Sequence, residues 1–396
     1  MITNSHLISG ETFIDKNSLD IYPVSRSDDE INEKYNKGEI RIVTEQARYP
    51  IDSIETMLDS KRYILNPEYQ RRKRWNYTQK SRLIESLIMN VPISPIFLYE
   101  IDYSTYEVID GEQRLTAIYD FYKGKFNLEG LEYWQELNGR NYQNLPGQVR
   151  RGIDRRYLSS IVLLQETAKN EREAEYVKHI VFERLNSGGD KLTPQETRNA
   201  LHNGKFNQVC IKLAQNDYFR KMWKLPLESE GEEKLLKSES YRKMEDVELV
   251  LRFFAYRHID NLKSPVDKFL DEYLKQANNY SDQTIKYLET LFNETIQLIY
   301  TILGNSAFIP PKGERERTKP LKTIYDPIMQ VFANNIAYKE SLLINKDAIK
   351  NNLYSEQESL NIKEENNRLL FDGRYNNKKD VEARMSYFHN FLQNYI

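Results

Sequence analysis

A short turn between an apolar run and a helix carries residues that could hold a phosphate. The run that ends at Asp110 contains strand-forming residues, and a helix is predicted to begin at Glu112 or Gln113. Glycine adopts backbone angles that other residues resist, so the chain can turn sharply at Gly111. The first amides of a helix have no partner inside it and attract anions. Arg114 adds a planar cationic fork that matches phosphate oxygens.

The two carboxylates of this turn could manage a metal ion or a water molecule. Glu112 beside a phosphate could hold Mg²⁺, which takes one or two carboxylates together with phosphate oxygens and water. Asp110 could do the same, or could position an attacking water as in other phosphoryl-transfer sites. An ordinary surface turn can carry the same residue types, and spacing alone does not decide between these two interpretations.

A basic segment with interleaved aromatic residues, Tyr69–Trp75, precedes the turn in the chain. Basic and aromatic side chains together can contact phosphates and stack on bases, so DNA is a candidate ligand. A solvated basic surface is the alternative. Gln70 follows a strand-like segment and could enter a site formed by strand ends. The cations of this segment are Arg71, Arg72, Lys73 and Arg74.

Two further stretches have residue types that bind ligands. A second basic cluster could contact nucleic acid, although a solvated face is favoured there. A helix end, a glycine turn and a helix start follow one another in Arg184–Thr193, where Asn186 could bond a ligand or simply cap the helix. The glycines of this turn are Gly188 and Gly189. The second basic cluster mentioned above consists of Arg150, Arg151, Arg155 and Arg156.

Composition narrows the protein class. Lys and Arg total 57 against 59 Asp and Glu, for a net charge of -2, so any nucleic-acid surface must be a local patch. The single cysteine, Cys210, excludes an internal disulfide framework and a cysteine zinc cluster, and its neighbours predict a buried helix position. The five histidines lack metal-binding spacing, and no P-loop motif is present. With no membrane-length apolar run or signal peptide, we expect a cytoplasmic protein without a membrane partner.

Hydrophobic periodicity and turn residues predict an α+β fold. Residues before about Gly38 are polar and could be a flexible arm or a peripheral strand. A small mixed sheet is expected from strands at Ile40–Val43, Arg62–Leu65, Ile96–Tyr99, the run before Gly111, and Ser159–Leu164. The helices expected with it are Ile51–Leu58, Thr78–Asn90 with Thr78 as cap, and one from the turn to Gly124.

After residue 169 the sequence is predicted to be helical, so we expect domains at 1–169, with a core of about 40–169, and at 170–396. Thr193, Pro194 and Glu196 form a strong helix start, with a cap, a first-turn proline and a capping box. The other expected helices are Glu171–Leu185, Phe206–Gln215, Tyr241–His258, Pro265–Gln276, Thr284–Ile302, Leu321–Tyr338, Lys346–Leu353 and Val381–Tyr395.

Several motifs in this order resemble the GmrSD-type N-terminal family, a domain of unknown function related to the ParB/sulfiredoxin fold. The match covers roughly Ile51 to Leu201. The family's usual Asp-Gly-Gln-Gln-Arg signature has Glu112 in place of its first Gln here, which moves it toward the Gly-Glu-Arg-Arg turn of ParB that cradles CTP. The motifs are Tyr69–Arg71 with Trp75, Leu83–Ile88, Val91–Ile93, Val108–Ala117 and Phe182–Gly189.

The resemblance implies a ParB-like domain that binds and often hydrolyses nucleotides in bacterial restriction of modified phage DNA. Gly111, Gln113 and Arg114 would then bind phosphates, while Asp110 and Glu112 would manage Mg²⁺ or water. Gln70 and Arg71 would complete the pocket. Further nucleotide ligands would come from the motif that contains Arg184, Asn186, Gly188 and Gly189. DNA would be contacted by Arg72, Lys73 and Arg74.

Two functions follow from the resemblance as alternatives. The first is a Mg²⁺-dependent NTPase that couples its nucleotide state to DNA engagement. The second is a non-catalytic DNA-binding or regulatory module that recruits a separate nuclease. Longer relatives add a histidine-based nuclease domain, but this chain has no His-x-x-Pro motif, so an intrinsic HNH nuclease is not expected. A homo-oligomer is possible under either function.

Overall fold

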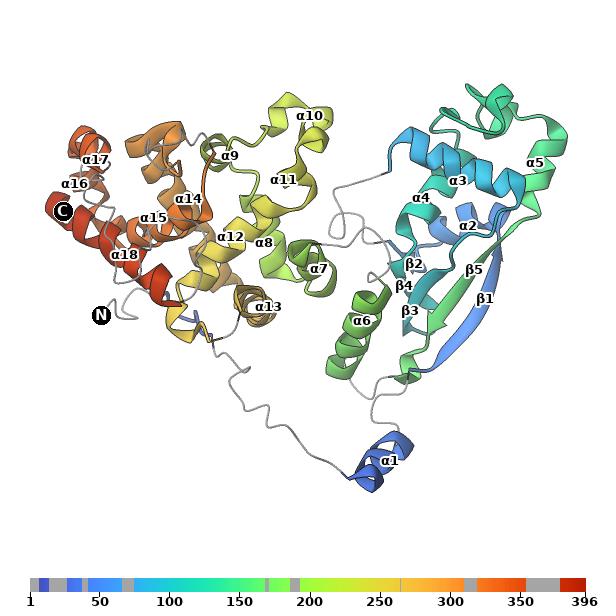
Figure 1. Ribbon diagram of the computed structural model, residues 1–396, viewed down its shortest axis with the longest axis horizontal. Helices are drawn as coiled ribbons and strands as arrows, with labels where there is room; N and C mark the ends of the chain where they lie inside the picture. The colour runs from blue at the N-terminus through green and yellow to red at the C-terminus, as the bar shows by residue number, and fades with distance from the viewer. Residues whose placement is uncertain are drawn as a thin grey trace. The chain divides into compact units, whose positions relative to one another are not determined.

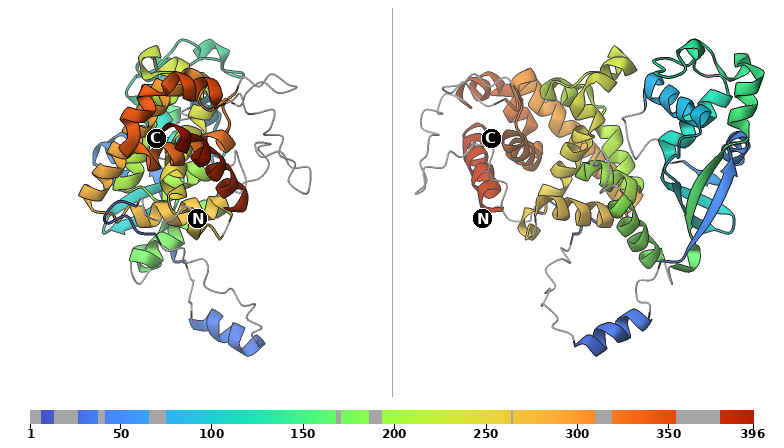
Figure 2. Two further views of the ribbon diagram at one scale, coloured as in Figure 1. Left: turned by 90° about the vertical axis from the view of Figure 1, so that its left-hand side faces the viewer. Right: turned by 45° about the vertical axis from the view of Figure 1, so that its right-hand side comes forward.

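The computed structural model describes residues 7–13, 27–37, 42–65, 75–167, 171–185, 193–263, 265–309, 319–353 and 378–396. The chain divides into two compact units, shown in Figures 1 and 2. The sheet unit is Pro23–Leu192, and the helical unit combines Met1–Tyr22 with Thr193–Ile396. The predicted α+β class is therefore confirmed, with a small mixed sheet in the N-terminal region and helices in the C-terminal part.

Five strands form a mixed sheet in the order β1-β5-β3-β4-β2. β5 pairs antiparallel with β1 and parallel with β3, whereas β4 pairs antiparallel with β3 and parallel with β2. Most of these strands overlap the predicted runs. Their bounds are β1 Thr44–Pro50, β2 Tyr63–Ile64, β3 Ile96–Asp102, β4 Thr105–Asp110 and β5 Tyr157–Leu163.

The first strand lies later than the sequence predicted. The expected strand at Ile40–Val43 is wrong in its described part, because β1 begins at Thr44. Val43 still contributes a carbonyl, which accepts a hydrogen bond of 3.1 Å from the Leu164 amide. β1 is a polar, mostly exposed edge strand, so pairing with β5 defines it rather than an apolar pattern of its own.

Different helices cover the two faces of the sheet (Figure 1). Leu98 and Val108, opposite one another on β3 and β4, join the core that α2, α3 and α4 complete. Tyr99 and Glu107 are also opposite one another and point to the other face, since side chains alternate along a strand. There α6 places Lys178 Nζ 2.9 Å from Glu107 Oε2 and 5.3 Å from the Tyr99 ring centre.

The helices of the sheet unit mostly follow the predicted ranges. α6 has the predicted bounds, but it packs within the sheet unit, whereas the sequence placed it beyond a boundary near residue 169. The α-helices are α1 Asp28–Lys37, α2 Ile54–Asp59, α3 Tyr77–Met89, α4 Glu112–Tyr122, α5 Gly147–Asp154 and α6 Glu171–Leu185. The 3-10 helices are η2 Ile51–Ser53, η3 Gln135–Leu137, η4 Tyr142–Asn144 and η5 Gln165–Thr167.

The cap of α3 is not the residue that the sequence predicted. Asn76 caps the helix: its side chain accepts a hydrogen bond of 2.8 Å from the Gln79 amide, and the Gln79 side chain accepts one of 3.1 Å from the Asn76 amide. Thr78 lies inside the helix and donates its hydroxyl to Glu129 instead. Of the predicted apolar face, Leu83 is buried, whereas Val91 lies beyond the helix and is 47% exposed.

We expect Lys178→Ala to destabilise the sheet unit by about 0.5–1 kcal/mol, because the ion pair with Glu107 is only partly exposed. Urea unfolding followed by tryptophan fluorescence would measure the change. Arg82→Ala is the matched control, because its pair with Glu132 is 58% exposed on both sides and should contribute less. Equal midpoints for both variants would contradict a role for Lys178 in fastening α6.

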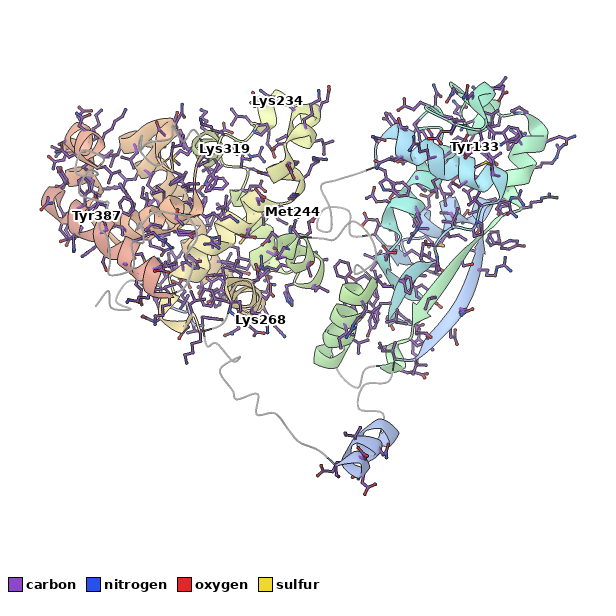
Figure 3. All side chains as sticks on the ribbon, in the orientation of Figure 1. Tyr133, Lys234, Met244, Lys268, Lys319 and Tyr387 are labelled. Carbon is purple, nitrogen blue, oxygen red and sulfur yellow. The ribbon has the colours of Figure 1, made fainter. Side chains whose placement is uncertain are left out.

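The helical unit has a helix in each range that the periodicity predicted, although not every expected helix is continuous. The expected helix Tyr241–His258 is split by Met244, whose φ of 56° is left-handed (Met244 is labelled in Figure 3). The described helices are α7 Pro194–Leu201, α8 Lys205–Leu213, α9 Asp217–Trp223, α10 Glu232–Lys237, α11 Glu239–Arg242, α12 Glu245–Tyr256, α13 Val266–Ala277, α14 Asp282–Leu303, α15 Lys322–Asn334, α16 Lys339–Ile344, α17 Lys346–Asn352 and α18 Lys378–Leu392. The 3-10 helices are η7 Glu228–Glu230, η8 Ile259–Asn261, η9 Gly304–Ser306, η10 Ile336–Tyr338 and η12 Gln393–Tyr395.

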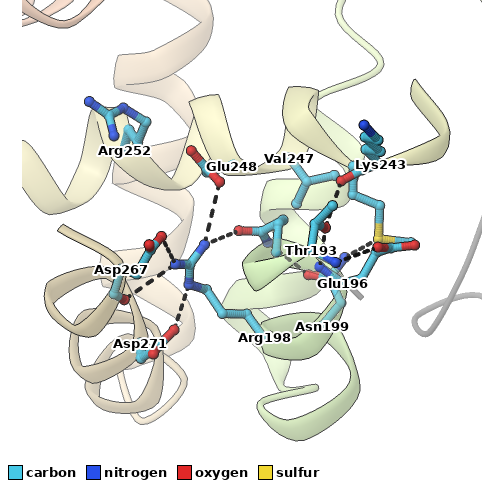
Figure 4. Close-up of polar contacts among 12 residues, drawn as sticks. Thr193, Glu196, Arg198, Asn199, Lys243, Val247, Glu248, Arg252, Asp267 and Asp271 are labelled. Atoms are coloured by element: carbon cyan, nitrogen blue, oxygen red, sulfur yellow. Dashed lines mark hydrogen bonds and ion pairs between the residues drawn. The ribbon is translucent and has the colours of Figure 1, made fainter. Parts of the chain in front are cut away.

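Buried polar groups fasten the first helix of this unit (Figure 4). Thr193 and Glu196 form the predicted capping box at the start of α7. Arg198, with a side chain only 1% exposed, lies 2.8 Å from Asp267 and 2.6 Å from Asp271 on α13. A buried cation must be paired, so these contacts fix α7 against α13.

The helical core also contains Cys210, which is fully buried on α8 as predicted. Burial raises the pKa of its thiol. In the described part of the chain, no helix combines the length and apolar character needed to cross a membrane.

Residues 7–13 pack on the helical unit, and they form neither a strand nor a free arm. Phe13 is buried among aromatic rings, with ring-centre distances of 5.4 Å to Phe269 and 5.6 Å to Tyr273. Glu11 accepts two hydrogen bonds of 2.8 Å from the guanidinium of Arg257. The segment therefore completes a core whose other buried residues all lie at Phe206 or later in the chain.

Candidate nucleotide-binding turn

The Asp110–Arg114 turn joins β4 directly to α4, as predicted. Gly111 precedes the helix with φ 101° and ψ 7°, in the left-handed region that favours glycine. A Cβ atom at this position would lie 2.3 Å from Ile96 Cγ2. Glycine is therefore required at this position both by the left-handed backbone and by the packing of Ile96 against it.

Arg114 is held at the turn by two acceptors. Its Nη2 donates 2.7 Å to Asp110 Oδ2 and 3.2 Å to the Pro95 carbonyl, just before β3. Its Nε–H is buried and has no hydrogen-bond partner among the residues that the structure describes. The guanidinium is therefore fixed in place with part of its donor capacity unused.

Gln113 ties the preceding basic segment to the turn. Its Oε1 accepts a hydrogen bond of 3.0 Å from the Trp75 amide. Trp75 is the residue that follows Arg74, so one end of the basic segment is anchored beside the turn. The structure thus places Gln113 in contact with the backbone of its own chain, where the sequence predicted a phosphate ligand.

The two carboxylates of the turn differ in accessibility. The Asp110 side chain is 46% exposed, whereas Glu112 as a residue is only 9% exposed. Within the described ranges, no group of three or more His, Cys, Asp or Glu side chains could hold a metal ion. Asp110 is therefore the more accessible oxygen donor of the two.

Helix α6 runs toward the end of the sheet where the turn lies. β4 runs opposite to β3 and β5, and α6 follows β5 and returns in the direction of β4 (Figure 1). Counting from the Lys178–Glu107 pair, Arg184 is six residues, or roughly 9 Å, further along the helix. Asp110 is three residues, or roughly 10 Å, further along the strand. The exposed Arg184 therefore lies toward the same end of the sheet.

The remaining predicted residues lie outside the described residues. For this reason their part in a site stays a prediction. They are the nucleotide ligands Gln70, Arg71, Asn186, Gly188 and Gly189, and the DNA contacts Arg72, Lys73 and Arg74.

Sequence reasoning missed two contributors to the turn. The Pro95 carbonyl and the Ile96 side chain reach the turn from the start of β3. The Phe97–Asp110 pairing of β3 with β4 brings them there. The available signal was the pair of neighbouring strand patterns, which predicted the two strands but not their pairing or register.

Comparison with known proteins identifies the region that contains this turn. Residues 54–203 match the family model described as "GmrSD restriction endonuclease, N-terminal domain". No curated protein and no solved structure gives a match. The predicted relation to ParB therefore stays a prediction, while the predicted family is confirmed. Residues 54–203 of this chain belong to the GmrSD restriction endonuclease N-terminal domain family.

Proposed function

We propose that this protein is a component of a restriction-type system and that its Asp110–Arg114 turn binds the phosphates of a nucleoside triphosphate. The family match supports the first part. The left-handed Gly111 beside a helix N-terminus is the observation that carries the second. A phosphate there would meet backbone amides, the positive end of the helix dipole and the Arg114 guanidinium.

The pairing of Arg114 with Asp110 suggests how the turn would respond to a ligand. A phosphate oxygen offers the same charge-assisted hydrogen bonds as a carboxylate. Binding would therefore compete for Arg114 and also use its unpaired Nε–H. Asp110 would orient the guanidinium before binding and become available to other partners afterwards.

A magnesium ion fits this donor set when it arrives with the nucleotide. Mg²⁺ takes one or two carboxylates with phosphate oxygens and water, and Asp110 offers one exposed carboxylate. When bound, the ion would neutralise phosphate charge. Asp110 would hold the ion, and Glu112 would act from a buried position by stabilising the start of α4.

Titration calorimetry of the full chain with GTP, ATP and CTP, each with and without magnesium, tests the proposal. We expect Arg114→Ala to weaken binding at least tenfold, because a charge-assisted hydrogen bond contributes about 1.5–3 kcal/mol. Arg82→Ala removes another arginine of the sheet unit and should leave binding unchanged. Absence of binding by the unaltered protein with all three nucleotides would disprove a nucleotide site.

The burial of Glu112 favours a second candidate, a non-catalytic module that senses nucleotide or DNA and recruits a nuclease. Glu112 is only 9% exposed, so little of its carboxylate faces a water that it could activate. Phosphate release measured on the same samples separates the candidates: turnover that Asp110→Asn abolishes supports an NTPase that couples its nucleotide state to DNA. Binding without turnover supports the sensor.

A further inference from the structure

We propose that a surface of the sheet unit remote in sequence from the turn binds the phosphodiester backbone of nucleic acid. The arginine surface consists of Arg48 on β1, Arg150 and Arg151 on α5, and Arg155 at the end of α5. The proposal goes beyond nucleotide binding and rests on different residues from those of the turn.

The charge of this surface is local and unbalanced. The whole chain has nearly equal cations and anions, but Gly139–Leu163 contains five arginines and a single acidic residue, Asp154. Asp154 Oδ1 accepts hydrogen bonds from the hydroxyls of Tyr122 and Tyr142, so it is occupied by neutral partners. The segment therefore has a net positive charge that its own residues do not neutralise.

The four arginines of the surface also lack carboxylate partners, as far as the described residues extend. Several cations elsewhere in the sheet unit are paired, among them Lys80 with Asp120, Lys123 with Glu55, and Lys178 with Glu107. Unpaired guanidinium groups keep their full donor capacity, which suits phosphate oxygens.

The fold brings these arginines together. β1 and β5 pair antiparallel, with Pro50 opposite Tyr157, and the Ile51 amide donates to the Arg156 carbonyl. Arg48 consequently lies next to the chain that leaves α5, and its guanidinium lies 5.1 Å from the centre of the Tyr157 ring. Arg151 and Arg155 share one face of α5, four residues apart. Figure 1 shows α5 at the end of the sheet where β1 finishes and β5 begins.

Two features favour nucleic acid over an acidic protein. Tyr157 is 54% exposed, so its ring can stack on a base while Arg48 contacts a neighbouring phosphate. Arg150 lies 6.0 Å from the Tyr142 ring centre, which repeats the arginine–tyrosine pairing. Acidic side chains would use the arginines but would make no use of the exposed Tyr157 ring.

The arginine surface is tested by fluorescence anisotropy on the full chain, without nucleotide, using duplex and single-stranded oligonucleotides over a range of salt. The variant Arg151→Glu/Arg155→Glu should bind about tenfold or more weakly. Its slope of log K against log salt should fall by roughly 1.8 on duplex and 1.4 on single strands, at about 0.9 and 0.7 per phosphate contact. Arg82→Glu/Lys237→Glu is the control, since it changes net charge equally at two exposed ion pairs.

Tyr157 distinguishes the two forms of nucleic acid. Tyr157→Ala should weaken single-strand binding at least fivefold, while Tyr157→Phe keeps the ring and should bind normally. If the arginine double variant weakens binding to duplex alone, the surface contacts phosphates without stacking on bases. The proposal is overturned if the arginine double variant matches its control on every oligonucleotide, or if the protein prefers polyglutamate to DNA. Arg114→Ala should leave this binding intact, so failure here and failure of the nucleotide site are distinguishable.

Discussion

Gly111→Ala is expected to destabilise the sheet unit by about 2–6 kcal/mol and to remove nucleotide binding. A left-handed backbone costs a non-glycine residue about 1–3 kcal/mol, and overpacking costs about 1–3 kcal/mol more. Both terms apply, because φ is 101° and the new Cβ would lie 2.3 Å from Ile96 Cγ2 and 2.9 Å from Ile96 Cβ. Ile96 cannot move away easily, since it is fully buried at the start of β3.

Gly139→Ala separates the cost of the left-handed backbone from the cost of the contact with Ile96. Gly139 has a φ of 83°, lies in the same unit, and would meet nothing within 4 Å if a Cβ were added. It should therefore cost only the backbone term, about 1–3 kcal/mol. Denaturant unfolding measures both variants in a Trp223→Phe background, so that fluorescence reports Trp75 and Trp134 of the sheet unit. Equal losses in the two variants would show that the contact with Ile96 contributes nothing.

The contacts of this turn between residues close in sequence could be predicted, whereas its contacts with residues far away in the sequence could not. A strand-forming run, a glycine and a helix-forming run follow each other within a dozen residues, so the turn at Gly111 was evident. The Arg114–Asp110 pair is also local, four residues apart on the helix start. The contacts to Pro95 and Trp75 span 19 and 38 residues, and only the register of β3 on β4 and the packing of α3 on α4 determine them.

Periodicity shows the same limit for whole elements. It predicted α6 at its observed bounds, because apolar spacing along a helix is a local property. It did not predict that α6 packs on the sheet through Lys178, because an amphipathic face does not specify its partner. β1 was misplaced for the opposite reason: this edge strand has no apolar alternation and forms only by pairing with β5.

Residues 7–13 were the hardest to predict, and Glu11 gives their contribution a measurable pH dependence. Burial alone would raise the pKa of Glu11, but its contacts with His258 and Arg257 and the Ile8 amide lower it from 4.5 to about 2. A lowered pKa in the folded state means that the stabilisation is complete above about pH 4.5 and is lost as pH falls toward 2. The shift corresponds to roughly 3 kcal/mol at 1.36 kcal/mol per pKa unit.

Glu11→Gln should therefore destabilise the helical unit by about 3 kcal/mol at pH 7, because it removes the buried negative charge that pairs with Arg257. The difference from the unaltered protein should shrink as pH falls from 5 to 2, since the native carboxylate then becomes protonated. Unfolding curves at several pH values, read from Trp223 in a Trp75→Phe/Trp134→Phe background, measure this. Glu233→Gln removes an 86% exposed carboxylate of the same unit and should show little effect at any pH. A Glu11→Gln difference that stays constant across this range would assign the loss to packing of the segment, because only the interactions of the ionised carboxylate titrate.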